Sequence, residues 1–271
     1  MLKNFLIILL LSGGYANAIQ PVYKNTTGKH KIDCNNLENV AVLLVLGQSN
    51  AANSGEVKYA VKNQVINVYE GECYLANDPL LGATGARGSV WGRVADKLID
   101  NGIFNNVVIK SIAVGGSPIV SWTQDGKGPV HGNYFKRIMD SIRELRVLGF
   151  EVTFILWHQG EQDTSFGTST SKYKEMFLNM LNGIRKIGEL NAPIYVARAS
   201  LCQGRSSKKV IQAQNELIDQ NIDILEGPNT DLINESKYRI DGGCHFSESG
   251  LKFHANMWYE SISRGRHEGA N

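Results

Sequence analysis

The sequence predicts an α/β protein in which helices cover both faces of a mostly parallel sheet. Apolar runs rich in β-branched residues alternate along the chain with amphipathic stretches whose apolar residues recur every three or four positions. Several apolar runs are nearly continuous, which is typical of central parallel strands that are buried on both sides. Strand and helix follow each other through short connections, as a parallel sheet requires.

Each expected element has its own local signal. The expected strands are 40–46, 65–69, 106–112, 151–157 and 193–199. The expected helices are 90–101, 134–148, 172–189, 207–220 and 248–263. One apolar face of the helix at 172–189 is formed by Tyr173, Met176, Phe177, Met180, Leu181 and Ile184. Ser247 precedes the last helix and is a suitable N-cap.

The first 18 residues have the features of a secretory signal. Lys3 supplies the positive start, residues 5–11 are a short apolar core, and residues 16–18 (ANA) offer a small-residue cleavage pattern. The core is shorter than the roughly 20 apolar residues that span a bilayer. We therefore expect cleavage after Ala18, a secreted or periplasmic product without stable membrane insertion, and a single domain over residues 19–271.

The charge of the chain gives no reason to expect a polyanionic partner. The sequence has 28 Lys and Arg against 26 Asp and Glu, and loss of Lys3 with the signal leaves 27 basic residues against 26 acidic ones. A balance this close to neutral offers little attraction to nucleic acid or to an anionic membrane surface. No internal repeat or low-complexity tract is present. The oligomeric state is left open.

Four cysteines, Cys34, Cys73, Cys202 and Cys244, show no spacing typical of a zinc site. An even number in an exported protein favours two disulfides, and three pairings are possible. Cys34 and Cys73 flank the first two expected strands, whereas the other two follow late elements, so we expect Cys34–Cys73 and Cys202–Cys244. The alternative is four reduced, buried thiols.

The first apolar run ends in a polar turn. Residues 42–55 read VLLVLGQSNAANSG, so Ser49 stands directly after the strand. Gly, Ser and Asn are common turn formers, which makes this motif by itself weak evidence for a nucleophile. A functional role requires that other polar clusters also follow strands, because the site of such a fold lies at the carboxyl ends of its strands.

Three further polar segments meet that requirement. Residues 113–118 (AVGGSP) and 157–163 (WHQGEQD) follow strands, and residues 241–246 (DGGCHF) precede the last helix. We therefore expect four polar segments to gather at one edge of the sheet.

These segments contain the groups that acyl transfer needs. A serine hydroxyl is a poor nucleophile until a base removes its proton, and His245 is the candidate base for Ser49. The base needs an acid that fixes its tautomer and stabilises the imidazolium. Asp241 is close by in sequence, whereas Glu161 and Asp163 could reach the ring through space.

The developing oxyanion needs preorganised hydrogen-bond donors. The backbone N–H groups of Ser49 and Gly116 are suitable, and the side-chain amide of Gln159 is a third candidate. Glycine favours this role because its backbone can approach a ligand without a Cβ in the way.

The motifs GQSN, GGS…W, WHQGE and D…CHF…G together resemble the SGNH/GDSL hydrolase superfamily. Within it they are most similar to the branch of carbohydrate esterase family six and sialate O-acetylesterases. The resemblance spans about residues 40–260. It implies a three-layer α/β/α, flavodoxin-like fold and the removal of acetyl groups from sugars without metal or organic cofactor. It also implies that Ser49 is the nucleophile, Gly116 a backbone donor, Gln159 the side-chain donor in place of the usual Asn, and His245 the base.

One position departs from the family pattern. The superfamily usually places its acid three residues before the histidine, where this chain has Gly242, while Asp241 lies four residues before it. Either the glycines let Asp241 reach the ring, or Glu161 replaces it, or the site is a Ser-His dyad oriented by a backbone carbonyl. Asp241 is slightly favoured.

Further residues are candidate substrate contacts. Gln48 and Asn50 flank Ser49. Trp122 offers either a sugar-stacking face or core packing. The glycine-rich stretch 82–88 lacks the ending of a phosphate loop and the spacing of a dinucleotide fingerprint, so we interpret it as a mobile loop near the site. Arg87, within this stretch, is a candidate contact for an anionic substrate.

The sequence therefore predicts an exported serine esterase that deacetylates a carbohydrate through an acetyl-serine intermediate. Acetylxylan, sialic acid, peptidoglycan and capsule polysaccharide remain open as the carbohydrate. A glycan O-acetyltransferase with the same site, a non-catalytic carbohydrate-binding protein and a lipase or thioesterase are the alternatives.

Overall fold

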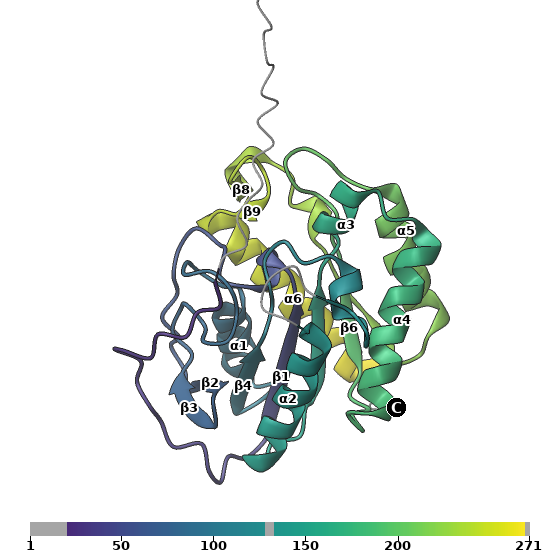
Figure 1. The fold of residues 1–271 in the computed structure, drawn as a ribbon. Coiled ribbons are helices and arrows are strands. Elements are labelled where there is room, and N and C mark those ends of the chain that lie inside the picture. Colours follow the sequence, from purple (N-terminus) through teal and green to yellow (C-terminus); the bar gives the residue numbers. More distant parts are fainter. Residues whose placement is uncertain (1–20, 128–132, 269–271) are drawn as a thin grey trace, which may run out of the picture.

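A seven-stranded sheet with the order β3-β2-β4-β1-β5-β6-β7 forms the centre of the computed structural model, which describes residues 21–127 and 133–268 (Figure 1). The strands are β1 (Val40–Gly47), β2 (Val65–Tyr69), β3 (Glu72–Leu75), β4 (Asn106–Ser111), β5 (Phe154–His158), β6 (Ile194–Arg198) and β7 (Ile224–Asn229). All neighbours pair in parallel except β2 and β3. The expected mostly parallel sheet is confirmed.

The order of five of these strands is that of a flavodoxin-like sheet. Along the chain β1, β4, β5, β6 and β7 are the first to the fifth of this set, and in space they lie in the order 2-1-3-4-5. The antiparallel pair β2 and β3 extends the sheet beyond β4. The chain reverses its direction of winding between β1 and β5, and ligands of such folds bind at the carboxyl ends of the strands at that point.

Helices lie on both faces of the sheet (Figure 1). They are α1 (Trp91–Asp100), α2 (Tyr134–Val147), α3 (Glu161–Phe166), α4 (Thr170–Lys186), α5 (Lys208–Gln220) and α6 (Glu248–Glu268). Side chains of α2, α4 and α5 form the apolar core on one face, and those of α1 and α6 form the core on the other. The expected three-layer α/β/α arrangement is confirmed.

The apolar run of β1 is continuous because the strand is buried on both faces. Val42, Leu44 and Leu46 point into the core beneath α2, α4 and α5. Ala41, Leu43 and Val45 point into the core beneath α1 and α6. Because successive side chains of a strand point to opposite faces, a strand covered on both faces must be apolar at every position.

Several elements lack the sequence signals used above. β7 reads ILEGPN and is an edge strand, where Pro is tolerated because one side of the strand needs no ladder hydrogen bond. α3 is a short polar helix, EQDTSF. β3 is short and follows a turn in which Glu70 and Gly71 both have positive φ, as two-residue hairpin turns require. β5 begins at Phe154 rather than at the expected position 151.

A second, two-stranded sheet consists of β8 (Arg239–Ile240) and β9 (His245–Phe246). This sheet directly precedes α6. The backbone N–H of Gly250 in α6 donates to the hydroxyl of Ser247, which confirms the expected N-cap. In Figure 1 this hairpin lies at the same end of the molecule as α3.

Both expected disulfides, Cys34–Cys73 and Cys202–Cys244, are present. The first joins the segment before β1 to β3. The expected signal at residues 1–18 lies outside the described residues. Of the helices that the structure describes, none has the length and hydropathy of a membrane span.

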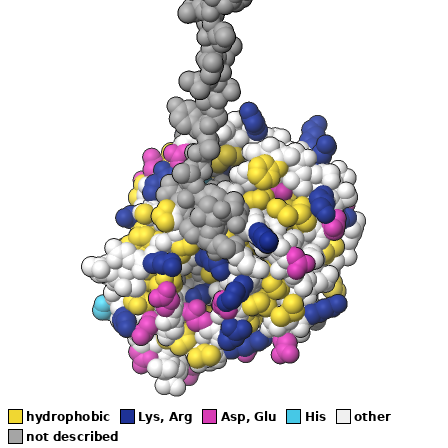
Figure 2. All heavy atoms as spheres, in the orientation of Figure 1, with side chains coloured by type: hydrophobic (Ala, Val, Ile, Leu, Met, Phe, Trp, Pro, Cys, Tyr) yellow, Lys and Arg dark blue, Asp and Glu magenta, His cyan; other side chains and the backbone are white. Residues whose placement is uncertain are grey.

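The visible face of the protein carries charges of both signs. Figure 2 shows Lys and Arg side chains interspersed with Asp and Glu on the face of Figure 1. This distribution agrees with the nearly neutral formal charge of the sequence.

Candidate active site

The turn after β1 places Ser49 at the carboxyl edge of the sheet. Gly47 ends the strand with a φ of +124°, and a Cβ at this position would lie 2.1 Å from the carbonyl oxygen of His158 on β5. Only glycine fits between the two strands here. Ser49 then begins a short 3₁₀ helix, η1 (Ser49–Ala51), and is 8% exposed. A serine therefore stands at the point where β1 and β5 diverge.

The loop after β4 brings Gly115 against this serine, and Gly116 follows it in the chain. A Cβ placed on Gly115 would lie 3.6 Å from the Cβ of Ser49, and the Gly115 amide donates to the Thr84 hydroxyl at 2.8 Å. Gly116 has a φ of +68°. Among the described residues, no hydrogen-bond acceptor faces the backbone N–H of Ser49 or of Gly116. The serine's own N–H and the N–H of the glycine that follows Gly115 are therefore both available as donors.

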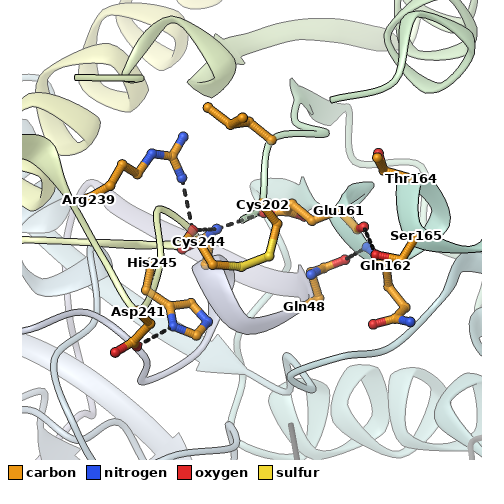
Figure 3. Close-up of a disulfide and its surroundings, with 12 residues drawn as sticks. Gln48, Glu161, Gln162, Thr164, Ser165, Cys202, Arg239, Asp241, Cys244 and His245 are labelled. Carbon is orange, nitrogen blue, oxygen red and sulfur yellow. Dashed lines mark hydrogen bonds and ion pairs between the residues drawn. A yellow bond between two sulfur atoms is a disulfide. The ribbon is translucent and has the colours of Figure 1, made fainter. Parts of the chain in front are cut away.

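The histidine and its acid lie on the hairpin of β8 and β9. His245 pairs with Ile240 across the hairpin, and residues 241–244 form the turn. Asp241, Gly242 and Gly243 all have positive φ. This left-handed turn brings Asp241 Oδ2 to 2.6 Å from His245 Nδ1, as Figure 3 shows. The glycines therefore compensate for a spacing of four residues between acid and base.

The other two candidate acids do not contact His245. Glu161 begins α3, is 2% exposed, and its Oε1 accepts from Asn50 Nδ2 at 2.7 Å. Its carboxylate also lies 3.5 Å from His158 Nε2. Burial raises the pKa of Glu161, but the contacts with His158 and Asn50 outweigh burial and lower the pKa below its usual range. Asp163 instead accepts hydrogen bonds from Ile119, Gln159 and Thr168.

Asn50 joins the serine turn to the histidine hairpin. Its Nδ2 donates to Glu161 and also to the carbonyl oxygen of Cys244 at 3.1 Å, directly before His245. Both amide hydrogens of Asn50 are therefore used within the protein. Asn50 therefore holds the serine turn and the histidine hairpin together. The sequence had suggested Asn50 as a substrate contact.

Arg87 lies against the acid and the base. Its Nη2 donates to Asp241 Oδ2 and to the carbonyl oxygen of Ser54, and it lies 3.4 Å from His245 Nδ1. Burial raises the pKa of Asp241, but Arg87 and His245 outweigh burial and lower the pKa below its ordinary value. Arg87 and Asp241 are 154 positions apart in the sequence, so no local pattern indicates this pairing.

The structure selects one of the two roles considered for Trp122, and the role expected for Gln159 does not fit. Trp122 is fully buried, lies edge-on against Trp157 and donates to the Ser117 hydroxyl, so it packs in the core and offers no face to a sugar. Gln159 is also fully buried. Its Nε2 donates to Asp163 at 2.5 Å and to the Ser117 carbonyl at 3.1 Å, so no amide hydrogen remains for an oxyanion.

The disulfide Cys202–Cys244 ties the histidine hairpin to the loop after β6 (Figure 3). On the other side of the hairpin, the buried Arg239 donates to the carbonyl oxygens of Cys244, Thr230 and Ile233. These contacts fix the backbone immediately before His245.

The serine and the histidine lie on adjoining segments that Asn50 connects. Within the described part of the chain, no hydrogen bond joins the Ser49 hydroxyl to the ring of His245. Such catalytic hydrogen bonds often close only when substrate binds.

Comparison with known proteins identifies a family and a fold. The model of the family described as carbohydrate esterase, sialic acid-specific acetylesterase matches residues 39–262. A comparison with curated proteins gives no match.

Solved structures of similar fold were also found. An Arabidopsis thaliana protein has a TM-score of 0.63 at 16% identity, over 83% of this chain and 98% of its own. NanS has a TM-score of 0.58 at 15% identity, over 86% of this chain and 99% of its own. A carbohydrate acetylesterase from Xanthomonas citri has a TM-score of 0.51 at 15% identity, over 82% of this chain and 55% of its own. At these identities the likeness shows a shared fold.

Proposed function

This chain belongs to the carbohydrate esterase family of sialic acid-specific acetylesterases, and we propose that it is an exported serine esterase that deacetylates a glycan through an acetyl-serine intermediate. Family membership makes it an ester-hydrolysing enzyme that removes O-acetyl groups. The observation that carries the finer proposal is the Asp241–His245 hydrogen bond beside a strand-end serine with two unpartnered N–H donors.

In the first half of the proposed reaction, Ser49 Oγ attacks the acetyl carbonyl carbon while His245 Nε2 takes the hydroxyl proton. Asp241 keeps the proton of Nδ1 in place and stabilises the imidazolium. The carbonyl oxygen becomes an oxyanion that accepts from the N–H groups of Ser49 and Gly116. The tetrahedral intermediate then breaks its bond to the sugar oxygen, which takes the proton from His245.

In the second half, water replaces the sugar. His245 removes a proton from the water, and the resulting hydroxide attacks the acetyl carbon bound to Ser49. Collapse of the second tetrahedral intermediate breaks the ester bond to Oγ, returns the proton to Ser49 and releases acetate. These steps use only groups of the chain, the substrate and water.

Two features support export. The chain contains two disulfides, which persist mainly in oxidising compartments. The first 18 residues carry the composition of a secretory signal.

Arg87 favours a sugar that carries a carboxylate. Its side chain is 42% exposed, and only its Nη2 is held by Asp241 and Ser54. We expect Arg87→Gln to raise KM for an O-acetylated sialic acid more than for a neutral acetylated sugar such as acetylxylose. An equal change in both KM values would remove Arg87 from the substrate site.

The direct test measures acetate release from p-nitrophenyl acetate and from a panel of acetylated glycans. The protein lacking residues 1–18 is compared with Ser49→Ala and His245→Ala, and folding is checked by circular dichroism. We expect turnover in the parent and its loss in both folded variants. A folded parent without turnover that still binds glycans would support the carbohydrate-binding alternative instead.

An acetyltransferase would use the same first half-reaction, with a glycan hydroxyl in place of water. Incubating the acetyl-enzyme with unacetylated glycans separates the two. Hydrolysis predicts stoichiometric free acetate and no acetyl gain on the glycan.

A further inference from the structure

The oxyanion site described above lacks a side-chain donor, because both amide hydrogens of Gln159 face Asp163 and Ser117. Gln48, immediately before the nucleophile, differs from Gln159 in which end of its amide is free to bind a substrate. Gln48 is 3% exposed, and its oxygen, rather than its nitrogen, is occupied by the protein.

The orientation of the Gln48 amide is determined by two backbone donors. Its Oε1 accepts from the N–H of Gln162 at 3.0 Å and from the N–H of Gly160 at 3.4 Å. If the amide were reversed, its NH₂ group would face two N–H donors. Oε1 must therefore face α3, and Nε2 must face away from it.

The nitrogen of Gln48 is directed to the side of the catalytic ring. In Figure 3 the Gln48 oxygen lies on the side of Gln162, and its nitrogen lies on the side of His245. Among the described residues, no acceptor lies within hydrogen-bond distance of this nitrogen. A largely buried amide with a fixed oxygen and an unused NH₂ group thus adjoins Ser49.

We propose that Gln48, rather than Gln159, is the side-chain donor to the carbonyl oxygen of the substrate and to the oxyanion that forms from it. This inference rests on the proposed esterase function. Because the two backbone donors that hold Oε1 are in place before substrate binds, the NH₂ group is preorganised and needs no reorientation during the reaction. The hydrogen bonds that Oε1 accepts also polarise the amide and strengthen its N–H groups as donors.

The competing explanation is that Gln48 only anchors the start of α3. Two substitutions separate anchoring from catalysis. Gln48→Glu keeps the size and an oxygen that accepts from Gly160 and Gln162, but its ionised carboxylate has no hydrogen to donate. Gln48→Met keeps the approximate size without charge and removes both the acceptor and the donor. Gln159→Glu serves as the comparison, because it places a second carboxylate beside Asp163 and is expected to lower Tm.

The experiment measures kcat and KM for p-nitrophenyl acetate, Tm, and the inhibition constant of phenylboronic acid, which forms a tetrahedral adduct with a serine oxygen. We expect kcat to fall about 10²–10³-fold in both Gln48 variants, the typical effect of losing one oxyanion donor. KM is expected to change little, and boronate binding is expected to weaken in parallel with kcat. Gln48→Glu is expected to keep the parent Tm.

The inference is overturned if a folded Gln48→Glu and Gln48→Met both keep kcat within about threefold of the parent, well short of that effect. It is also overturned if kcat falls while boronate binding is unchanged, since that pattern indicates a structural role. A folded parent without esterase activity would contradict the proposed function itself, and that result is recognised before any variant is made.

Discussion

The contacts of two carboxylates, Asp241 and Glu161, show which of them can act as the acid that orients His245. Asp241 contacts the ring, whereas Glu161 lies on the far side of Asn50 and contacts His158. The two carboxylates therefore have different roles, which substitutions of similar size can separate.

We expect Asp241→Asn to lower kcat by about 10²–10⁴-fold, because an amide can hold the wrong tautomer of the ring. Asp241 is 43% exposed, so the variant is expected to keep the parent Tm. Glu161→Gln removes a buried charge from its partners and is expected to lose about 1–3 kcal/mol of stability. Its kcat is expected to fall less than that of Asp241→Asn. Steady-state kinetics and thermal melts check both outcomes, and the reverse order of kcat losses would assign the acid to Glu161.

Arg87 keeps the carboxylate of Asp241 ionised at lower pH. Arg87 favours the ionised form of Asp241, so its loss should raise the pKa of that carboxyl and reduce the ionised fraction at low pH. We expect kcat/KM of Arg87→Gln for a neutral ester to decline at a higher pH than in the parent as pH falls from 7 to 4. Arg143→Gln, an exposed arginine that pairs with Asp140, is the control and should leave the profile unchanged. Superimposable profiles for Arg87→Gln and the parent would contradict this role.

At the scale of elements, short segments between strands build the site. The turn after β1, the glycine loop after β4, the start of α3 and the β8–β9 hairpin all lie at one edge of the sheet. A disulfide holds this hairpin to the loop after β6.

The two disulfides allow a matched test of whether the Cys202–Cys244 bond positions His245. Their cysteines are 39 and 42 positions apart, so the chain-entropy model predicts that each contributes about 4 kcal/mol to stability. We expect the double variants Cys34→Ser/Cys73→Ser and Cys202→Ser/Cys244→Ser to lose similar stability in denaturant titrations. Only the second is expected to lower kcat, measured where both remain folded. Equal kcat values in the two variants would show that the Cys202–Cys244 bond does not position His245.

At the scale of the whole molecule, stability also depends on a buried carboxyl away from the hairpin. Asp78 accepts from the backbone N–H groups of Tyr59 and Ser89, and its side chain is 1% exposed. Burial raises the pKa of Asp78 to about 6, although these hydrogen bonds oppose the shift. The folded protein therefore binds this proton more tightly than the unfolded chain.

Because the folded state holds the extra proton, raising the pH from about 4 to about 7 should reduce the free energy of unfolding. The shift of Asp78 alone corresponds to about 3 kcal/mol over this interval, since one pKa unit is about 1.4 kcal/mol. We expect Asp78→Asn to flatten the decline, measured by urea titrations at several pH values. Asp219→Asn, at an exposed position of α5, is the control. A decline as steep in Asp78→Asn as in the parent would exclude Asp78 as its source.

The sequence by itself determined five of the seven strands of the central sheet, most helices and the four polar segments, because these follow from local periodicity. It also determined Ser49 and His245 as candidates, since residue types and their motifs limit the choice. It missed the short strand β3, and it missed β7 and α3, whose Gly, Pro and polar residues lack an apolar pattern.

Only the tertiary structure decided which partner each polar group meets. Asp241 reaches His245 through three left-handed residues, Arg87 joins them from 154 positions away, and the amides of Gln48 and Gln159 face opposite ways. Trp122 is likewise assigned to the core by its neighbours. These choices depend on strand order and side-chain orientation, because a hydrogen bond requires its two atoms within about 3 Å, a condition that spacing along the chain does not specify.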